Sequence, residues 1–158
     1  MELDDYEINS ETLIVEPIDS ATSIVYEIED EFVVKKSCFS ILKDSCLFFG
    51  SSFDGRVEST KTFLACKMKV PIVIEESKNM IFFPTNSIKN VRCIWISYKN
   101  LLKYCRNDKN STLLCFKNNR NIVINVRYNI IDNQIIRCIK LESLWNKRKS
   151  DFYREKND

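Results

Sequence analysis

PIVIE at Pro71–Glu75 and MIFFP at Met80–Pro84 are two short runs of β-branched and aromatic residues near the middle of the chain. The polar link ESKN at residues 76–79 joins them. Runs of this composition favour β-strands, and a four-residue link suits a β-hairpin. The sequence therefore predicts its clearest hairpin here, and the other expected elements lie on either side of it.

The N-terminal side of this hairpin is expected to begin with a small meander of three strands. Apolar and β-branched runs predict them at Thr12–Pro17, Ser23–Ile28 and Phe32–Val34. Ser37 is a suitable N-cap for a short helix that ends near residues 44–46. A second helix is expected at Arg56–Cys66.

The C-terminal side mixes both periodicities. A strand is expected at Val91–Ser97, and apolar residues at i, i+3, i+4 and i+7 predict an amphipathic helix over Tyr98–Cys105. A second hairpin should join Thr112–Phe116 to Ile122–Val126 through Lys117–Arg120, whose asparagines tolerate the left-handed region. The C-terminal helix is predicted from apolar residues at helical spacing, namely Ile131, Ile135, Cys138, Leu141 and Trp145.

These elements together predict an α+β fold made mainly of antiparallel strands and hairpins, with a few helices that include one at the C-terminus. We find no internal repeat and no linker rich in Pro, Ser or Gly. Residues 1–158 are therefore expected to form a single domain.

The net charge of +2 hides an asymmetry along the chain. Residues 1–34 hold 11 of the 22 acidic residues and no Lys or Arg, so their formal charge is −11. Residues 35–158 carry all 24 basic residues against the other 11 acidic ones, which gives +13. A basic body indicates a polyanion partner. An acidic segment that folds back and neutralises the body explains the same charges, and composition does not separate the two interpretations.

The residue types that most enzymes need are scarce or absent. The seven cysteines form no CxxC or CxxxxC pair, and the chain has no histidine for a zinc site or a catalytic triad. An odd number of cysteines without a signal peptide argues against a disulfide framework, so we expect reduced thiols that are mostly buried. Neither GxxxxGK[ST] nor GxGxxG occurs. We therefore expect no metal, no cofactor and no enzymatic activity.

The chain shows no signal for a membrane or for export. No apolar run approaches the roughly 18 residues of a membrane span. Residues 1–5 are acidic and lack the basic and apolar regions of a signal peptide. A cytoplasmic location without a membrane partner is the expectation.

Both glycines, Gly50 and Gly55, lie in the segment CLFFGSSFDGR at Cys46–Arg56. In a chain with only two glycines, this placement predicts either a positive φ or a close approach of the backbone to another group. The large aromatic residues are expected in the core rather than stacked on bases. These are Phe48, Phe49, Phe82, Phe83 and Trp95.

Hydroxyl and cationic side chains near the glycines and around the first hairpin suit contacts with phosphate oxygens. Each lysine taken alone is by default a solvated surface residue, whereas Arg56 stands out because it directly follows Gly55. The candidate DNA-binding residues are Ser51, Ser52, Arg56, Lys67, Lys69, Lys89, Arg92 and Lys99.

The segment DSCLFFGSSFDGR at Asp44–Arg56 resembles the signature Ser-Cys-x-Phe-Phe-Gly-Ser-Ser-aromatic-x-Gly-Arg of the ComK family of competence transcription factors. Shorter blocks continue the resemblance in order, so that it spans residues 10–145. These blocks are Pro71-Ile72, Ile81–Thr85, Cys93–Ser97, Tyr128-Asn129 and Asn133-Gln134.

The resemblance implies an activator of DNA-uptake genes that binds paired A/T-rich boxes of double-stranded DNA through the minor groove, as a homodimer or a pair of dimers. The chain ends soon after Lys147–Lys149, whereas the family continues into a segment tied to activation and to a proteolytic adaptor. Those two functions are therefore not carried over, although an adaptor remains a candidate partner. The alternative is a shortened protein-interaction module that engages a partner through residues 1–34 or the C-terminal helix.

Overall fold

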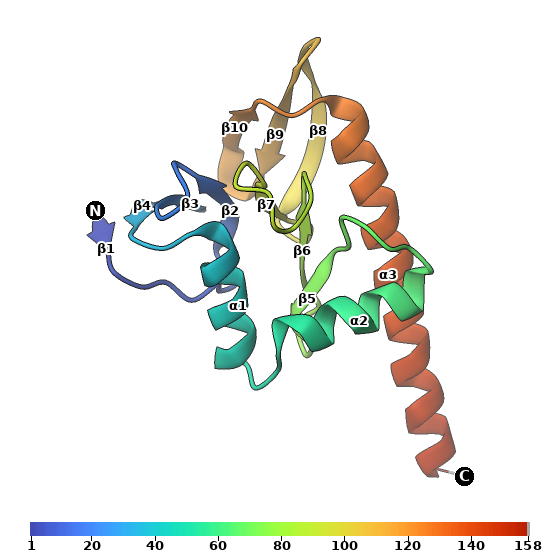
Figure 1. The fold of residues 1–158 in the computed structure, drawn as a ribbon. Helices are drawn as coiled ribbons and strands as arrows, with labels where there is room; N and C mark the ends of the chain where they lie inside the picture. Colours follow the sequence, from blue (N-terminus) through green and yellow to red (C-terminus); the bar gives the residue numbers. More distant parts are fainter. Residues whose placement is uncertain (158) are drawn as a thin grey trace.

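The computed structural model describes the backbone of residues 1–157 and the side chains of residues 1–154 (Figure 1). Within these residues the α+β prediction is confirmed, because antiparallel strands dominate and a long helix ends the chain. The strands are β1 (Glu2–Leu3), β2 (Thr12–Pro17), β3 (Ser23–Glu27), β4 (Glu31–Val34), β5 (Ile72–Glu75), β6 (Met80–Pro84), β7 (Trp95–Ser97), β8 (Leu101–Asp108), β9 (Ser111–Phe116) and β10 (Arg120–Ile124). The helices are α1 (Cys38–Phe48), α2 (Phe53–Leu64), the 3-10 turn η1 (Lys117–Asn119) and α3 (Tyr128–Asn157).

The strands form two sheets. The larger sheet has the order β1-β4-β3-β2-β7-β6-β5, and all of its neighbours are antiparallel except the parallel pair β1 and β4. The smaller sheet has the order β10-β9-β8 and is antiparallel throughout. The predicted N-terminal meander is confirmed as β2, β3 and β4, and the central hairpin as β5 and β6.

The central hairpin is buried on both faces. Met80 and Phe82 of β6 lie in the core beneath α1 and α2, where they join Trp95. Ile81 and Phe83 alternate with them and face the second core, which the smaller sheet and α3 cover. Side chains of successive strand residues point to opposite faces, so a strand covered on both sides reads as a continuous apolar run. The layers are visible in Figure 1, with α1 and α2 in front of the sheet and α3 beside it.

The helix predicted over Tyr98–Cys105 is wrong. Residues 101–108 form β8, which pairs with β9 from Leu101 opposite Phe116 to Asp108 opposite Ser111. The register shifts between Leu101 and Lys103, and this irregularity interrupts the alternation of the strand. Apolar residues then fall three and four apart, as they do in a helix. The pairing with β9 therefore decides this segment, rather than its local pattern.

Other elements differ from prediction in their limits. α1 continues to Phe48, α2 begins at Phe53, and the strand expected from Val91 is reduced to β7, which is preceded by a long loop. Ser37 caps α1 as predicted, because its hydroxyl accepts a hydrogen bond from the Ser40 N–H at 3.1 Å. The second hairpin is confirmed as β9 and β10. In its link, Asn118 and Asn119 adopt the left-handed region, with φ values of 59° and 57°.

The prediction for the aromatic residues is confirmed at three positions and wrong at one. Phe82, Phe83 and Trp95 are fully buried, and Phe49 is half-buried. Phe48 is 65% exposed at the C-terminal end of α1. Cys46 and Phe49, on either side of Phe48 in the sequence, contact the core, whereas the Phe48 side chain lies outside this buried face and packs against the Phe49 ring.

Candidate nucleic-acid interface

The two glycines of the link between α1 and α2 satisfy different requirements. Gly50 has a φ of +80°, and its N–H donates to the Leu47 carbonyl at 3.0 Å while the next N–H, that of Ser51, donates to the Cys46 carbonyl at 3.0 Å. This pair of bonds closes the end of α1 as a Schellman motif. A Cβ at Gly55 would lie 2.8 Å from the Ser52 Oγ. Both halves of the expectation for the glycines are therefore met, one at each residue.

The two serines of this link bind the protein's own backbone. Ser52 is the N-cap of α2, and its hydroxyl accepts from the Gly55 N–H at 3.0 Å. The Ser51 hydroxyl donates to the Cys46 carbonyl at 3.1 Å and accepts from Arg56 Nε at 3.2 Å. The polar atoms of both side chains thus stabilise the α1–α2 connection. Contact of either serine with DNA stays a prediction.

Arg56 has an internal partner for its charge. Its Nη1 lies 2.8 Å from Glu76 Oε1, in the turn between β5 and β6, and only 11% of the Arg56 side chain is exposed. The side chain lines a cleft of about 820 Å³ whose opposite wall includes Trp145 and Arg148 of α3. DNA contact by Arg56 stays a prediction, and it requires the guanidinium to exchange Glu76 for a phosphate.

Three of the predicted lysines converge on one groove. Lys67 and Lys69, from the loop between α2 and β5, line a groove of about 310 Å³ together with Lys89, from the loop between β6 and β7. None of these three ammonium groups forms an ion pair with any residue that the structure describes. Unpaired cations from two loops that are separated in sequence make this groove the strongest candidate for binding an anion.

The groove also contains a lysine that the sequence analysis missed. Lys61 lines it from α2, and so do Asp54 and Val57, which precede it on the same helix by seven and four residues. This helical spacing was the signal that could have found Lys61. Its ammonium lies 3.7 Å from Glu58, so its charge is partly neutralised within the helix. Lys61 therefore adds a weaker positive charge to the groove than the loop lysines do.

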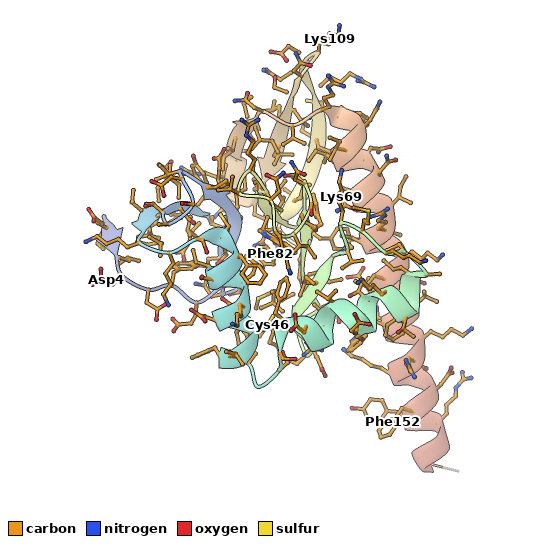
Figure 2. The ribbon with its side chains drawn as sticks, viewed as in Figure 1. Asp4, Cys46, Lys69, Phe82, Lys109 and Phe152 are labelled. Atoms are coloured by element: carbon orange, nitrogen blue, oxygen red, sulfur yellow. The ribbon has the colours of Figure 1, made fainter. Side chains whose placement is uncertain are left out.

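One buried glutamine joins the two loops of the groove. Gln134 of α3 is 2% exposed, and its Nε2 donates to the Lys69 carbonyl at 2.8 Å and to the Pro84 carbonyl at 2.6 Å. Arg137, one turn further along α3, donates from Nη1 to the Met68 and Lys69 carbonyls at 2.8 and 3.2 Å. The backbones of both loops are therefore attached to α3 through carbonyl groups. Figure 2 labels Lys69, which lies on the first of these loops.

The second loop, residues 85–94, is closed by its own hydrogen bonds. The Thr85 N–H donates to the Ile94 carbonyl at 2.9 Å, and the Ile94 N–H donates to the Thr85 hydroxyl at 3.0 Å. Within it, the Arg92 N–H donates to Asn90 Oδ1 at 2.8 Å. Lys89 and Arg92 are both exposed on this loop, but Arg92 is not among the residues that line the groove. DNA contact by Arg92 stays a prediction.

Lys99 lies apart from this group. It follows β7, at the opposite end of the β5–β6 hairpin from Pro84, and its Nζ donates to the Lys78 carbonyl at 2.6 Å. Lys99 is not among the residues that line the groove. A role for it at DNA stays a prediction.

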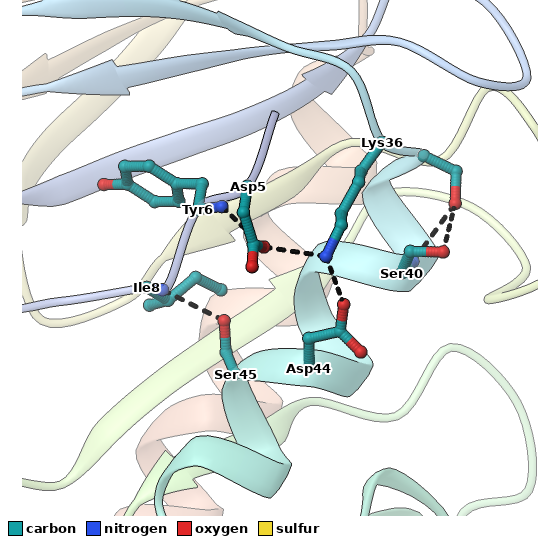
Figure 3. A network of polar contacts seen from close by, with 8 residues as sticks. Asp5, Tyr6, Ile8, Lys36, Ser40, Asp44 and Ser45 are labelled. Atoms are coloured by element: carbon teal, nitrogen blue, oxygen red, sulfur yellow. Dashed lines mark hydrogen bonds and ion pairs between the residues drawn. The ribbon is translucent and has the colours of Figure 1, made fainter. Parts of the chain in front are cut away.

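The acidic N-terminal segment neutralises a small part of the body. Lys36 donates to Asp5 at 2.7 Å and to Asp44 at 2.8 Å (Figure 3), and the Lys36 ammonium holds the pKa of Asp5 below its usual value. Further ion pairs join acidic residues of this segment to the body, including Lys35 with Glu2 at 3.1 Å and Arg120 with Glu31 at 2.6 Å. None of these pairs involves Lys67, Lys69 or Lys89, so the described part of the acidic segment does not neutralise these three lysines by direct contact.

Five of the seven thiols are buried. Cys38, Cys46, Cys93, Cys115 and Cys138 are buried, which matches the expectation for the cysteines as a class. Burial raises the pKa of Cys46 and that of Cys93 to about 11, so both are protonated at neutral pH. Among the residues that the structure describes, no group of three or more His, Cys, Asp or Glu side chains is placed to hold a metal ion.

No helix within the described residues combines the length and the apolar character needed to cross a bilayer. The site is thus a lysine-lined groove on an α+β domain, formed by two loops that a helix holds in place. Comparison with known proteins identifies the family of the chain. The profile of the ComK protein family matches residues 3–150, and the chain belongs to that family.

A characterised relative supports the same assignment. The competence transcription factor of Bacillus subtilis (strain 168) is 30% identical over 149 residues, which cover 92% of this chain and 78% of the relative. No solved structure matches the fold at a significant level.

Proposed function

We propose that this protein is a DNA-binding transcriptional regulator that activates competence and DNA-uptake genes in the cytoplasm. The observation that carries the proposal is the groove, in which the ammonium groups of Lys67, Lys69 and Lys89 form no ion pair with any side chain in the described part of the protein. Membership of the ComK family and the name of the B. subtilis relative support the regulatory role. An enzymatic activity is not part of the proposal.

The proposed target is the minor groove of A/T-rich boxes. Lysines from two loops reach phosphates on both sides of a narrow groove more readily than a single helix would. The minor groove of A-tracts is narrow and has an enhanced negative potential that attracts inserted cations. It distinguishes little beyond A·T from G·C, so a few cations at a shaped surface are sufficient for this kind of recognition. Paired boxes imply a homodimer or a pair of dimers.

The proposed contacts divide into two groups. Lys67, Lys69, Lys89 and Arg92 form the primary surface because their charged groups have no acidic partner among the described residues. A secondary group has polar atoms already bonded within the chain, and these residues would contact DNA only after exchanging partners. This group comprises Ser51, Ser52, Arg56 and Lys99.

Binding of a labelled duplex with two A/T-rich boxes, measured by fluorescence anisotropy across a series of salt concentrations, tests the proposal. A G/C duplex of the same length is the control. Each phosphate contact contributes about −0.9 to the slope of log K against log salt. Three groove lysines therefore predict a slope of about −2.7 or steeper. An affinity that ignores salt, or that is equal for the two duplexes, contradicts the proposal.

A second candidate function is favoured by one observation. The cleft beside Arg56 is bordered by Phe49 and Trp145, and by Phe152 and Tyr153, which are 59% and 65% exposed near the end of α3. Exposed aromatic residues beside a cleft are typical of a protein-binding surface. A partner or proteolytic adaptor seated there would make the chain a protein-interaction module. Size-exclusion chromatography with and without DNA separates the functions, because this one predicts a protein complex and no shift with DNA.

A further inference from the structure

Met68 is a large apolar residue exposed between two cations. Its side chain is 67% exposed, and it lies between Lys67 and Lys69 on the rim of the groove. Single exposed apolar residues are common on proteins and need no explanation by themselves. The position of this one is unusual, because a methionine between two unpaired lysines faces the surface that the proposed function assigns to DNA.

The backbone that presents Met68 is held rigidly. Ala65 and Lys69 have φ values of 50° and 52°, a left-handed conformation that is unfavourable for residues other than glycine. Arg137 binds the carbonyl of Met68, and Gln134 binds that of Lys69. Bonds from α3 thus stabilise a strained loop whose side chain at Met68 remains outside the core. A loop held this way positions the side chain before any ligand arrives.

Buried apolar residues lie close to Met68 in the sequence, on both sides of it. Val70 is fully buried two residues after Met68, and Leu64, four residues before it, is 7% exposed. Side chains before and after Met68 therefore lie in the core, whereas the side chain of Met68 is exposed. The side chain of Met68 is unbranched and flexible, so it can enter a narrow space.

The dimensions of the loop fit the minor groove. Residues 67 and 69 are two positions apart, so their Cα atoms are separated by at most about 7 Å. The minor groove is about 6 Å wide. Two lysine side chains that diverge from this loop can reach phosphates on opposite strands while the residue between them points to the floor of the groove.

Resting on the proposed function, we propose that Met68 is a wedge that enters the minor groove and partly unstacks one base step, while Lys67 and Lys69 bind the flanking phosphates. Apolar wedges that enter between base steps from this side include methionine in other minor-groove proteins. T-A steps are the most easily unstacked and occur in A/T-rich boxes. The wedge would therefore add selectivity for flexible A/T sequences beyond that of the charges.

The test uses an A/T-box duplex in which 2-aminopurine replaces the adenine of a T-A step, because unstacking raises the fluorescence of this base. Wild-type protein should raise the fluorescence on binding. Met68→Ala should lose most of that rise and bind about tenfold more weakly, which corresponds to the loss of one buried apolar contact. Its salt slope should stay unchanged because no phosphate contact is lost. Met68→Leu should retain the rise.

Leu102→Ala is the matched control, since Leu102 is 64% exposed on β8 and does not line the groove. This variant should behave as the wild type. A fluorescence rise with Met68→Ala equal to that of the wild type overturns the wedge. Salt-dependent binding by the wild type without any rise also overturns the wedge but leaves the proposed function standing. Absence of binding to the A/T duplex overturns both.

Discussion

The loops around the lysine groove and the link between α1 and α2 both drew attention in the sequence as concentrations of hydroxyl and cationic residues. The structure uses them differently. In the link, the charge of Arg56 and the hydroxyls of both serines are bonded within the chain. In the groove, the backbone is bonded to α3, and Lys67, Lys69 and Lys89 form no ion pair with the residues whose side chains the structure describes. A fixed backbone with unpaired charges supports the proposal that the groove, rather than the link, is the primary binding surface.

The largest effect is expected from Gln134→Leu, which keeps the size of the side chain and removes its amide. The carbonyl of Pro84 then lacks a donor in a buried position, and that of Lys69 keeps only Arg137. The free energy of unfolding should fall by roughly 2–4 kcal/mol, because the buried Pro84 carbonyl is left without a donor and the part-buried Lys69 carbonyl loses one of its two donors. DNA affinity should also fall in the fraction that remains folded. Chemical denaturation with parallel anisotropy measures both, and an unchanged affinity would show that the loops keep their spacing without the glutamine.

The second-largest effect is expected when Lys67, Lys69 and Lys89 are replaced together by alanine. Loss of three phosphate contacts should lower the affinity for the A/T duplex about 100-fold and reduce the magnitude of the salt slope by about 2.7, with little change in stability. The matched control replaces Lys103, Lys109 and Lys117 of the smaller sheet, which are all exposed and change the net charge equally. An equal loss in the control would mean that overall charge, rather than the groove, governs binding.

Arg56→Ala tests the structural role of the link between α1 and α2. It removes a nearly buried side chain together with its bonds to Glu76 and Ser51, so the free energy of unfolding should fall by roughly 1–3 kcal/mol. Thermal denaturation measures the change, and Glu76→Gln isolates the contribution of the ion pair. A tenfold loss of DNA affinity in a fully folded Arg56→Ala protein would show that Arg56 also contacts DNA, as its position beside Gly55 predicts. The contrast between the two regions would then be removed.

The smallest effect is expected from Ser52→Ala. Loss of the cap on the Gly55 N–H should lower the free energy of unfolding by about 1 kcal/mol. DNA affinity should not change if the hydroxyl serves only α2. Urea denaturation and anisotropy on the same preparation give both values. Ser52→Asn, which preserves a capping oxygen without adding charge, should restore stability, and weaker DNA binding by either variant would place Ser52 at the interface.

The local patterns predicted most elements because the forces that form them are local. Ser37 caps the helix that follows it, the asparagines of the second hairpin adopt the left-handed region, and the apolar runs of β5 and β6 pair as neighbours in sequence. The prediction was wrong for residues 98–105, where pairing with β9 overrides a helical spacing. Phe48 was expected in the core, but its side chain lies outside the face of α1 through which Cys46 and the neighbouring Phe49 contact the core.

The sequence by itself determined the α+β class, the positions of most strands and helices, and the resemblance that the family comparison confirms, since all of these depend on residues close together in the chain. The tertiary structure decided which cations remain unpaired. Arg56 meets Glu76 across 20 positions, and Gln134 reaches Lys69 and Pro84 across 65 and 50 positions. These contacts exist only after α3 and the two loops have packed on the sheet, because charge pairing and buried hydrogen bonds depend on distances that no local pattern encodes.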